Sequence, residues 1–326
     1  MLRPTLVVLS FLSATVTTAK PPEESLKRWA HPGVLLQPRF SWDSGTDDSI
    51  LRIERARLKL KGQRRDKALG YRLSVEVANA RLELKDAYID ARAYGKHLQI
   101  RAGHFKRPYS RQRLTGISAQ GMVDRAVTET AFDQDRDMGF MLHNGEKGGF
   151  GWALGLFSSF DFGVPDQAMG PALALRAGWA MKDLDGYNET DATGGPLRAG
   201  GAASLVAFFG DDKERPRGYR WEADAIAKAY GGLLSVAVFG RTPDTSLSGL
   251  SHDALGLFAH GAFRFFDELE VAARYAEVFN AKGANVPELT FGLTSYLYGG
   301  HLKPQAGVTW LPETDDVRVL VQLQVE

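Results

Sequence analysis

Short runs in which basic and apolar residues alternate constrain this chain more than any other feature of its sequence. The run 55–60 reads Arg-Ala-Arg-Leu-Lys-Leu, and the run 71–75 reads Tyr-Arg-Leu-Ser-Val. Successive side chains of a β-strand point to opposite faces, so each run predicts a strand with one cationic and one apolar face. Such a strand fits a half-buried sheet in a soluble protein, or the wall of an outer-membrane barrel with an apolar exterior and a basic lumen.

Charge is distributed unevenly along the chain. Residues 50–136 contain 20 Lys and Arg against 10 Asp and Glu, whereas the whole chain of 326 residues has a formal net charge of +1. After residue 136 the balance reverses, to 24 acidic and 15 basic residues. This asymmetry argues against a nucleic-acid binder and favours an internally polarised molecule.

The first nineteen residues have the layout of a secretory signal peptide. A basic start at Arg3 precedes an apolar centre over 6–12 and a small-residue site that ends at Ala19, where we expect cleavage. The alternative is a buried N-terminal strand or helix. The apolar centre is too short to span a bilayer as a helix. The chain has no cysteine, which excludes disulfide bonds.

Strand-like segments recur through the rest of the chain. No stretch after Ala19 approaches the ~20 consecutive apolar residues that a membrane helix needs, so a membrane form of this chain must be a closed barrel. We count sixteen segments bounded by turn residues, with fourteen or eighteen as alternatives. They are 34–42, 50–61, 69–77, 82–92, 97–104, 138–144, 150–158, 171–181, 198–209, 220–229, 232–240, 253–266, 268–278, 288–297, 301–310 and 316–325.

The predicted fold class is therefore all-β, a transmembrane antiparallel β-barrel of about 16 strands. We expect a signal peptide over 1–19 and a single outer-membrane barrel domain over 20–326. Five aromatic residues are candidates for the belts at the two membrane interfaces, with packing in a core as the alternative. They are Trp152, Trp179, Trp221, Tyr275 and Trp310.

One connection, from Phe105 to Asp137, is far longer than a hairpin loop. Counting strands makes it the third loop on the side opposite the chain termini. Long loops inside a compact domain are usually functional, and sixteen strands otherwise enclose an aqueous channel. We expect this loop, 105–137, to fold into the barrel and narrow it.

Three motifs point to a known family. Residues 55–58 read Arg-Ala-Arg-Leu, residues 84–89 read Leu-Lys-Asp-Ala-Tyr-Ile, and residues 101–110 read Arg-Ala-Gly-His-Phe-Lys-Arg-Pro-Tyr-Ser. They resemble the phosphate-selective porin O/P family, which reads R-A-R-L, then L-K-D-A-Y, then R-V-G-Q-F-K-x-P-F-S. Segments 291–297 and 302–305 also resemble its G-x-N-W-Y-L and V-K-L-Q strands. The resemblance covers 50–326 and is strongest over 50–160.

The resemblance implies a trimeric porin with sixteen strands, whose inward-folded third loop helps to form an anion-selective constriction. Carried over by position, the residues that line the pore and bind anions are Arg55, Arg57, Arg72, Arg101, Lys106, Arg107, Arg125 and Arg136. Two departures stand against it. The chain ends in Glu326, where such barrels end in an aromatic residue that the assembly machinery reads. Carboxylates at Asp133, Asp135 and Asp137 also lie beside Arg136.

Arginine suits phosphate because its planar fork donates paired hydrogen bonds and keeps its charge at any biological pH. We therefore predict an outer-membrane porin that passively conducts small anions, phosphate-like ones above all. The expected partners are inorganic anions, outer-membrane lipid and two further copies of the chain, with no nucleic acid. We find no catalytic set, metal site or cofactor motif in the sequence.

Three alternatives stay open at this stage. The cations could merely solvate a wide lumen and pair with Glu54, Glu76, Asp86 and Asp90, as in a general porin without specific anion binding. The barrel could have a structural or adhesive role without useful conductance. The chain could also be a secreted soluble β-sandwich or hydrolase.

Overall fold

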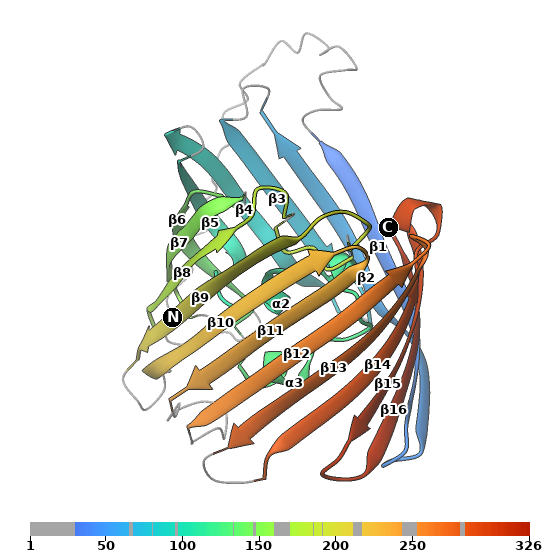
Figure 1. Cartoon of the computed structure of the whole chain (residues 1–326). Coiled ribbons are helices and arrows are strands. Elements are labelled where there is room, and N and C mark those ends of the chain that lie inside the picture. The colour runs from blue at the N-terminus through green and yellow to red at the C-terminus, as the bar shows by residue number, and fades with distance from the viewer. Residues whose placement is uncertain are drawn as a thin grey trace, which may run out of the picture.

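The computed structural model (Figure 1) describes residues 30–64, 68–79, 81–94, 97–132, 134–145, 148–159, 170–184, 186–190, 192–210, 217–242, 253–280 and 284–326. The predicted signal peptide lies outside these residues. Sixteen strands make up almost all of the described chain. They are β1 (His31–Asp43), β2 (Asp48–Gln63), β3 (Leu69–Glu76), β4 (Glu83–Tyr94), β5 (Leu98–Lys106), β6 (Arg136–His143), β7 (Gly149–Phe157), β8 (Ala172–Ala180), β9 (Arg198–Phe209), β10 (Arg217–Ala229), β11 (Gly232–Arg241), β12 (Ala254–Phe265), β13 (Leu269–Asn280), β14 (Val286–Ser295), β15 (Leu302–Leu311) and β16 (Asp316–Val325).

The strands form a closed antiparallel barrel in which each strand pairs with its neighbours in sequence. Closure occurs where β1 pairs with β16, for example Leu36 with Val325 and Phe40 with Val321. No sheet edge is left among these strands, so the ladder satisfies the backbone groups that lipid would leave unpaired. The predicted fold class and strand number are confirmed. No helix of the described residues is long and apolar enough to cross a membrane.

Side-chain burial alternates along the strands in the sense expected for a barrel in lipid. In β11, Leu234, Val236 and Val238 are 54%, 39% and 40% exposed, whereas Ser235 between them is buried. Polar residues therefore face inward and apolar residues outward, the reverse of a soluble protein. Aromatic residues lie near both ends of the outer surface. Trp179 is at the end of β8 on the side of the termini, and Trp310 at the opposite end.

Most described connections on the side of the termini are short. Tyr230 and Gly231 alone join β10 to β11, and both have positive φ, +48° and +87°. This is the geometry of a two-residue type I′ hairpin, whose twist matches that of the flanking strands. The connection between β8 and β9, residues 181–197, is an exception on this side.

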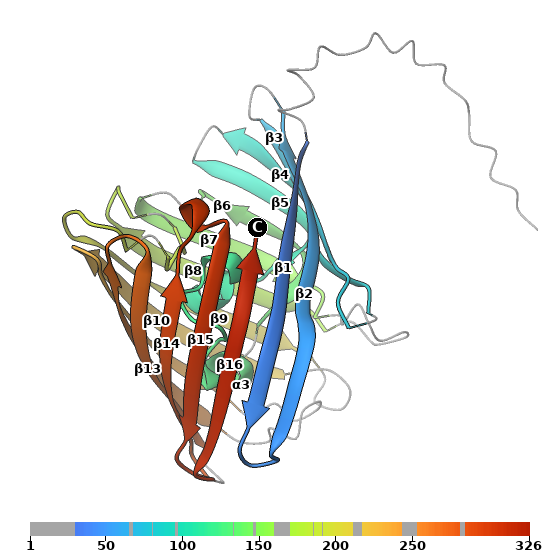
Figure 2. The same cartoon turned by 90° about the vertical axis from the view of Figure 1, so that its right-hand side faces the viewer.

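The long connection between β5 and β6 contains three short helical segments, α2 (Arg111–Leu114), η1 (Ile117–Ala119) and α3 (Val127–Ala131). A further short segment, η2 (Tyr298–Gly300), precedes β15. Figure 2 shows α2 and α3 enclosed by the strands. The main apolar cluster forms where this loop meets the wall, and Phe132 of the loop stacks on Phe239 of β11 with ring centroids 5.3 Å apart.

Candidate functional site: a basic cavity inside the barrel

A cavity of about 1380 Å³ lies between the connection from β5 to β6, here called loop 107–135, and the inner face of β2–β9. Four acidic residues line it: Asp86, Asp90, Asp135 and Asp183. The basic lining residues number fourteen, and they are Arg55, Arg57, Lys59, Arg72, Lys85, Arg92, Arg101, Lys106, Arg111, Arg113, Arg125, Arg136, Arg176 and Lys182. The surroundings of the cavity are therefore strongly cationic.

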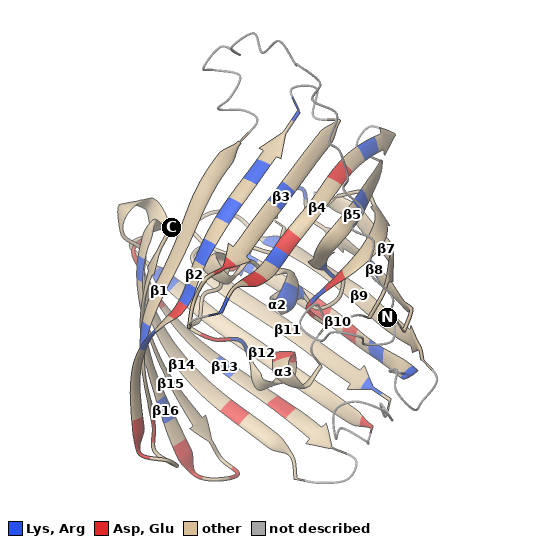
Figure 3. Cartoon of the chain, turned by 180° about the vertical axis from the view of Figure 1, so that it is seen from behind, with Lys and Arg blue, Asp and Glu red and all other residues tan. Residues whose placement is uncertain are grey.

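Strand β2 places its cations by simple alternation (Figure 3). Arg55, Arg57 and Lys59 are two residues apart, so all three face the lumen and line the cavity. On the facing wall, β7–β9 contribute small residues to the lining, among them Ala153 and Ala202. These small residues leave space opposite the cations, although Phe150, Trp152, Arg176 and Trp179 of β7 and β8 also line the cavity.

Three cavity cations form close ion pairs with carboxylates on other strands. Arg57 Nη2 is 2.7 Å from Glu76 Oε2, and Arg101 Nη2 is 2.5 Å from Asp90 Oδ2. Arg136 Nε is 2.8 Å from Asp86 Oδ1, and Arg72 Nε lies 3.4 Å from the other oxygen of the same carboxylate. These are acids that the sequence offered as neutralising partners, so part of the cationic charge is compensated locally.

Arg101 is held by stacking as well as by its ion pair. Its guanidinium carbon lies 4.4 Å from the ring centroid of Tyr88 and 5.6 Å from that of Phe105. The glycine of the same motif, Gly103, has φ of +128°, and a Cβ there would lie 2.2 Å from the carbonyl oxygen of Ala87. Only glycine therefore lets β5 approach β4 at this point, beside the stacked arginine.

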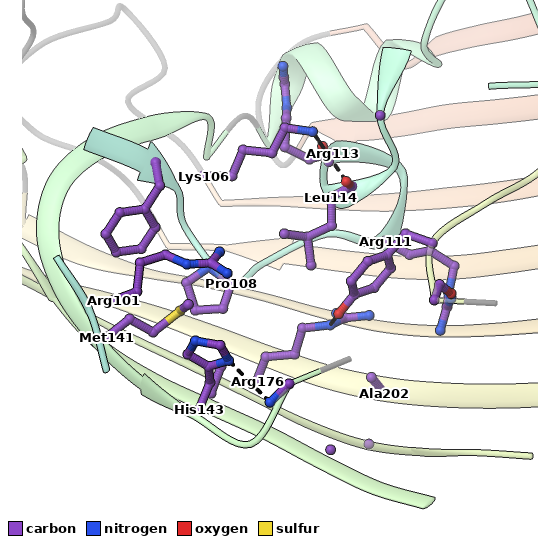
Figure 4. A pocket seen from close by; sticks show the side chains of 18 of the residues that line it. Arg101, Lys106, Pro108, Arg111, Arg113, Leu114, Met141, His143, Arg176 and Ala202 are labelled. Carbon is purple, nitrogen blue, oxygen red and sulfur yellow. Dashed lines mark hydrogen bonds between the residues drawn. The ribbon is translucent and has the colours of Figure 1, made fainter. Parts of the chain in front are cut away.

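Lys106 has a different role from the one its charge predicts. Its Nζ donates hydrogen bonds to the carbonyl oxygens of Arg113 and Leu114, at 2.5 and 3.2 Å (Figure 4), and to that of Thr115 at 3.1 Å. These carbonyls close the end of α2, where a helix leaves acceptors without internal partners. Lys106 lines the cavity, but its ammonium group donates to carbonyl oxygens of the loop and so stabilises the shape of the loop.

Arg55 and Arg125 differ from the other cavity cations. Neither guanidinium lies within 4 Å of a carboxylate of the described residues. Arg55 Nη1 donates to Gln37 Oε1 at 3.1 Å, and Arg125 donates to the carbonyl oxygens of Gln112 and Thr115, each at 3.3 Å. Burial, together with the nearby charges of Arg113 and Arg55, lowers the pKa of Arg125 to about 10.

The pKa of Asp135 indicates a positive electrostatic field at this point of the loop. Its burial acts to raise its pKa, yet the charges of Arg136, Arg113 and other nearby cations outweigh burial and lower the pKa to about 2. A fixed negative group is thus strongly stabilised here. The same field would stabilise a small anion in the cavity.

Arg107 does not line the cavity, although we expected it to lie in the pore. Its Nη2 is 2.7 Å from Asp137 Oδ2, and its Nη1 donates to Gln134 Oε1 at 2.7 Å. The residue directly follows Lys106, but its side chain is directed into the junction of loop and wall near Phe157. The other seven predicted residues all line the cavity.

Sequence reasoning missed a buried group that anchors the start of the loop. Arg176 Nη2 is 2.5 Å from Asp224 Oδ2, and its Nη1 is 2.9 Å from Glu222 Oε2. Arg111 of the loop completes the group, with Nε 2.6 Å from Asp224 Oδ1. A signal was present, because Arg176 occupies an inward position in a strand otherwise made of apolar residues.

The comparisons with known proteins agree with this architecture. Residues 39–199 match the family model described as phosphate-selective porin O and P. The chain is a porin of this family. The matched segment includes β2–β8 and the whole of loop 107–135, which together supply most of the lining of the cavity. A search of curated proteins found no match to the porin's sequence.

Solved structures share the fold of this porin at low sequence identity. An anion-selective porin from Comamonas acidovorans has 14% identity and a TM-score of 0.61, with 91% of this chain and 99% of that chain covered. OmpF of Salmonella typhi, in complex with daunomycin, has 12% identity and a TM-score of 0.67, with coverage of 91% and 97%. The trimer form of OmpT, an outer-membrane protein of Vibrio cholerae, has 11% identity and a TM-score of 0.59, with coverage of 91% and 99%.

Glu326, the departure from the expected aromatic end, has a defined place in this outer-membrane porin. Its side chain forms an ion pair with Lys59, with Nζ 2.5 Å from Oε1. Its backbone N–H donates to the carbonyl oxygen of His301 at 3.0 Å. The residue thus continues the inward row of β16 and takes one cavity cation into an ion pair.

Proposed function

We propose that this porin passively conducts small anions, phosphate-like ones in particular, across the outer membrane through the basic cavity. The observation that best supports this proposal is the composition of the cavity lining, which has fourteen basic residues and four acidic ones. Low-dielectric walls focus the field of such charges and raise the local concentration of anions. Rings of Arg and Lys are a common way for a pore to prefer anions.

Arg55 and Arg125 are the proposed contacts for a partly dehydrated anion. Both keep donors free of carboxylates within the described part of the chain, and they approach the cavity from β2 and from loop 107–135 respectively. An anion between wall and loop would relieve the mutual repulsion that helps to lower the pKa of Arg125. Their remaining hydrogen bonds, to an amide and to carbonyls, are weak enough to exchange during transport.

Arg57, Arg72, Arg101, Lys106 and Arg136 have a supporting part in the proposal. Their ion pairs and carbonyl contacts leave a net positive field with fewer free donors. Passage through a series of partly hydrated cations combines entry with release better than one deep pocket does. Export by a signal peptide over 1–19, assembly of three copies and contact with outer-membrane lipid belong to the same proposal.

A general porin with only weak anion preference is the second candidate, and one observation favours it. Several cavity cations are paired with carboxylates at 2.5–2.8 Å, which removes much of their local charge. The two candidates differ in whether phosphate competes with chloride for a site. A barrel with a structural or adhesive role alone would give no defined conductance steps.

Single-channel recording in potassium chloride with titrated phosphate distinguishes these functions. We expect phosphate to block chloride current at low millimolar concentration, and the double variant Arg55→Gln, Arg125→Gln to lose this block. Arg318→Gln is the matched control, because Arg318 is an exposed cation paired with Asp43 outside the cavity. Unblocked current with an anion-selective reversal potential would support the general porin, and a reversal potential without anion preference would reject both.

A further inference from the structure

A second loop enters the barrel from the side of the termini. Residues 181–197 join β8 to β9 and are far longer than the neighbouring connection between β10 and β11, which has two residues. Barrels of this type usually have short turns on the side of their termini. The loop's described residues, 181–184, 186–190 and 192–197, contact the inner wall and loop 107–135.

Apolar packing holds this loop against the inner wall at two points. Leu184 and Ala192 are 4% and 1% exposed, and they form a cluster with Ile226 of β10 and Leu233 of β11. The two strand residues occupy inward positions, flanked by outward residues on either side. Apolar side chains at lumen positions need such a cover, because water would otherwise contact them.

Cations of the wall bind the backbone of the loop between those two apolar contacts. Lys228 Nζ of β10 donates to the carbonyl oxygen of Asn188. Arg264 Nη1 of β12 donates to the carbonyl oxygen of Thr190 at 2.6 Å. Two carbonyls of the loop are thus satisfied by charged donors from different strands, which fixes the loop inside the barrel.

Glu189 joins this loop to loop 107–135. Its backbone N–H donates to the carbonyl oxygen of Ala119 at 3.0 Å, and its Oε2 accepts from the backbone N–H of Gly121 at 3.2 Å. A third contact runs from Arg111 Nη1 to the carbonyl oxygen of Gly186 at 3.3 Å. Glu189 is 4% exposed, so its carboxyl is enclosed between the two loops.

The loop also borders the cavity. Its residues Lys182, Asp183 and Tyr187 belong to the lining. The ring centroid of Tyr187 lies 5.5 Å from the guanidinium carbon of Arg111 and 5.6 Å from that of Arg176. The aromatic ring therefore covers two of the cavity's cations on the side where α2 meets the wall.

We propose that loop 181–197 is a second constriction element, which docks on loop 107–135 through Glu189 and limits the conductance of the pore from the side of the termini. The proposal requires that the porin conducts ions, but it does not require that it prefers anions. The two loops enter the lumen from opposite ends of the barrel and contact each other there. Tyr187 and the adjacent Lys182 and Asp183 form the surface that passing ions meet.

The first test replaces residues 181–197 with an Asn-Gly hairpin turn and measures single-channel conductance. We expect a rise of roughly twofold, because that part of a sixteen-strand lumen returns to water. The reversal potential in a salt gradient is measured on the same channels. Unchanged conductance would overturn the proposal, whereas a lost anion preference with raised conductance would affect only the proposed selectivity.

A second test uses the intact chain, in case the shortened barrel does not fold. The chain has no cysteine, so the double variant Ala119→Cys, Glu189→Cys introduces one unique pair between the loops and keeps the backbone hydrogen bond between residues 189 and 119. We expect mild oxidation of the folded porin in vesicles to cross-link it, giving a shift in gel mobility that reduction reverses. The pair Ala225→Cys, Val236→Cys on adjacent strands is the positive control. Cross-linking of the control without the loop pair would overturn the docking.

Discussion

Two parts of the barrel interior carry dense charge but differ in what surrounds it. The Arg72 side chain on β3 borders the cavity and is 40% exposed, while the Arg176 side chain on β8 is 5% exposed among Asp224 and Glu222. In the proposed function, the first exchanges its partners with passing ions. The second holds loop 107–135 to the wall. The same residue type is therefore open to solution or locked into the architecture, according to its burial.

The largest expected effect comes from removing a charge of the buried part. Arg176→Met leaves Asp224 and Glu222 enclosed with fewer partners, which typically costs about 3–5 kcal/mol for a buried ion pair. We expect the variant barrel to unfold at a lower temperature than the native barrel, as measured by the change in gel mobility that follows heating. Arg72→Met is the matched change in the cavity, where the cost is about 0–1 kcal/mol because solvent screens the pair. Equal destabilisation by the two variants would contradict the comparison.

A second pair of substitutions separates the shape of the loop from its charge. Lys303 Nζ donates to the carbonyl oxygens of Ser118 and Gln120, each at 2.9 Å, and lies behind the loop. We expect Lys303→Met to raise open-channel noise with little change in reversal potential. Arg125→Gln should shift the reversal potential toward cations by several millivolts with little added noise. Both properties are read from the same single-channel records, and a reversal of the two outcomes would reject the assignment.

The docking of the two loops should depend on pH through Glu189. Burial raises the pKa of this carboxyl above its ordinary value of 4.5, against the opposing effects of the hydrogen bond from Gly121 and of the charges of Arg274, Arg125 and Lys228, and Glu270 lies nearby. The docked state thus binds the proton more tightly. The contribution of protonated Glu189 to docking is therefore complete at pH values below its ordinary pKa. This contribution is lost as the pH rises through the raised pKa of the docked state.

The measurement is open-channel noise as a function of pH. Noise should increase with rising pH in the native porin and stay constant in Glu189→Gln, whose neutral amide still accepts the hydrogen bond from Gly121. Glu83→Gln is a control at an exposed carboxylate, paired with Lys85. An identical pH profile for the native chain and Glu189→Gln would exclude this carboxyl as the titrating group.

The smallest expected effect is the response to salt concentration, which should differ between the cavity cations and the buried group around Arg176. Between 0.1 and 1 M salt the screening length falls from about 10 Å to about 3 Å. Anion preference, measured as a permeability ratio, should decline by roughly twofold or more because the cavity cations face solution. The stability contributed by the enclosed group at Arg176 should change little. Constant selectivity over this range would indicate direct binding without a field effect.

Much of the fold could be predicted because alternation is a local signal. In each strand, the alternation of polar and apolar residues indicates which face meets lipid. In the run from Arg55 to Lys59, the alternating basic residues mark the face that points to the lumen. The position of loop 107–135 followed from counting strands. The cavity could be predicted in outline for the same reason, since inward positions of β2–β5 converge on one lumen.

Other features could not be predicted, because they depend on contacts between residues distant in sequence. Glu189 and Ala119 meet across two loops, and no local pattern marks either as a docking residue. Lys106 and Arg107 are adjacent and equally charged, yet one binds the carbonyls at the end of α2 and the other binds Asp137. Only the path of the chain at the end of β5 separates their roles.

The sequence by itself determined the barrel, a strand number near sixteen and the basic character of the lumen on its first strands, because alternation and composition act residue by residue. The tertiary structure decided which cations keep free donors. Ion pairing depends on register between strands, which brings Glu76 opposite Arg57 and leaves Arg55 beside Gln37. Enclosure depends on where two loops meet, and the desolvation that follows turns Arg176 into an anchor while Arg55 still faces the pore.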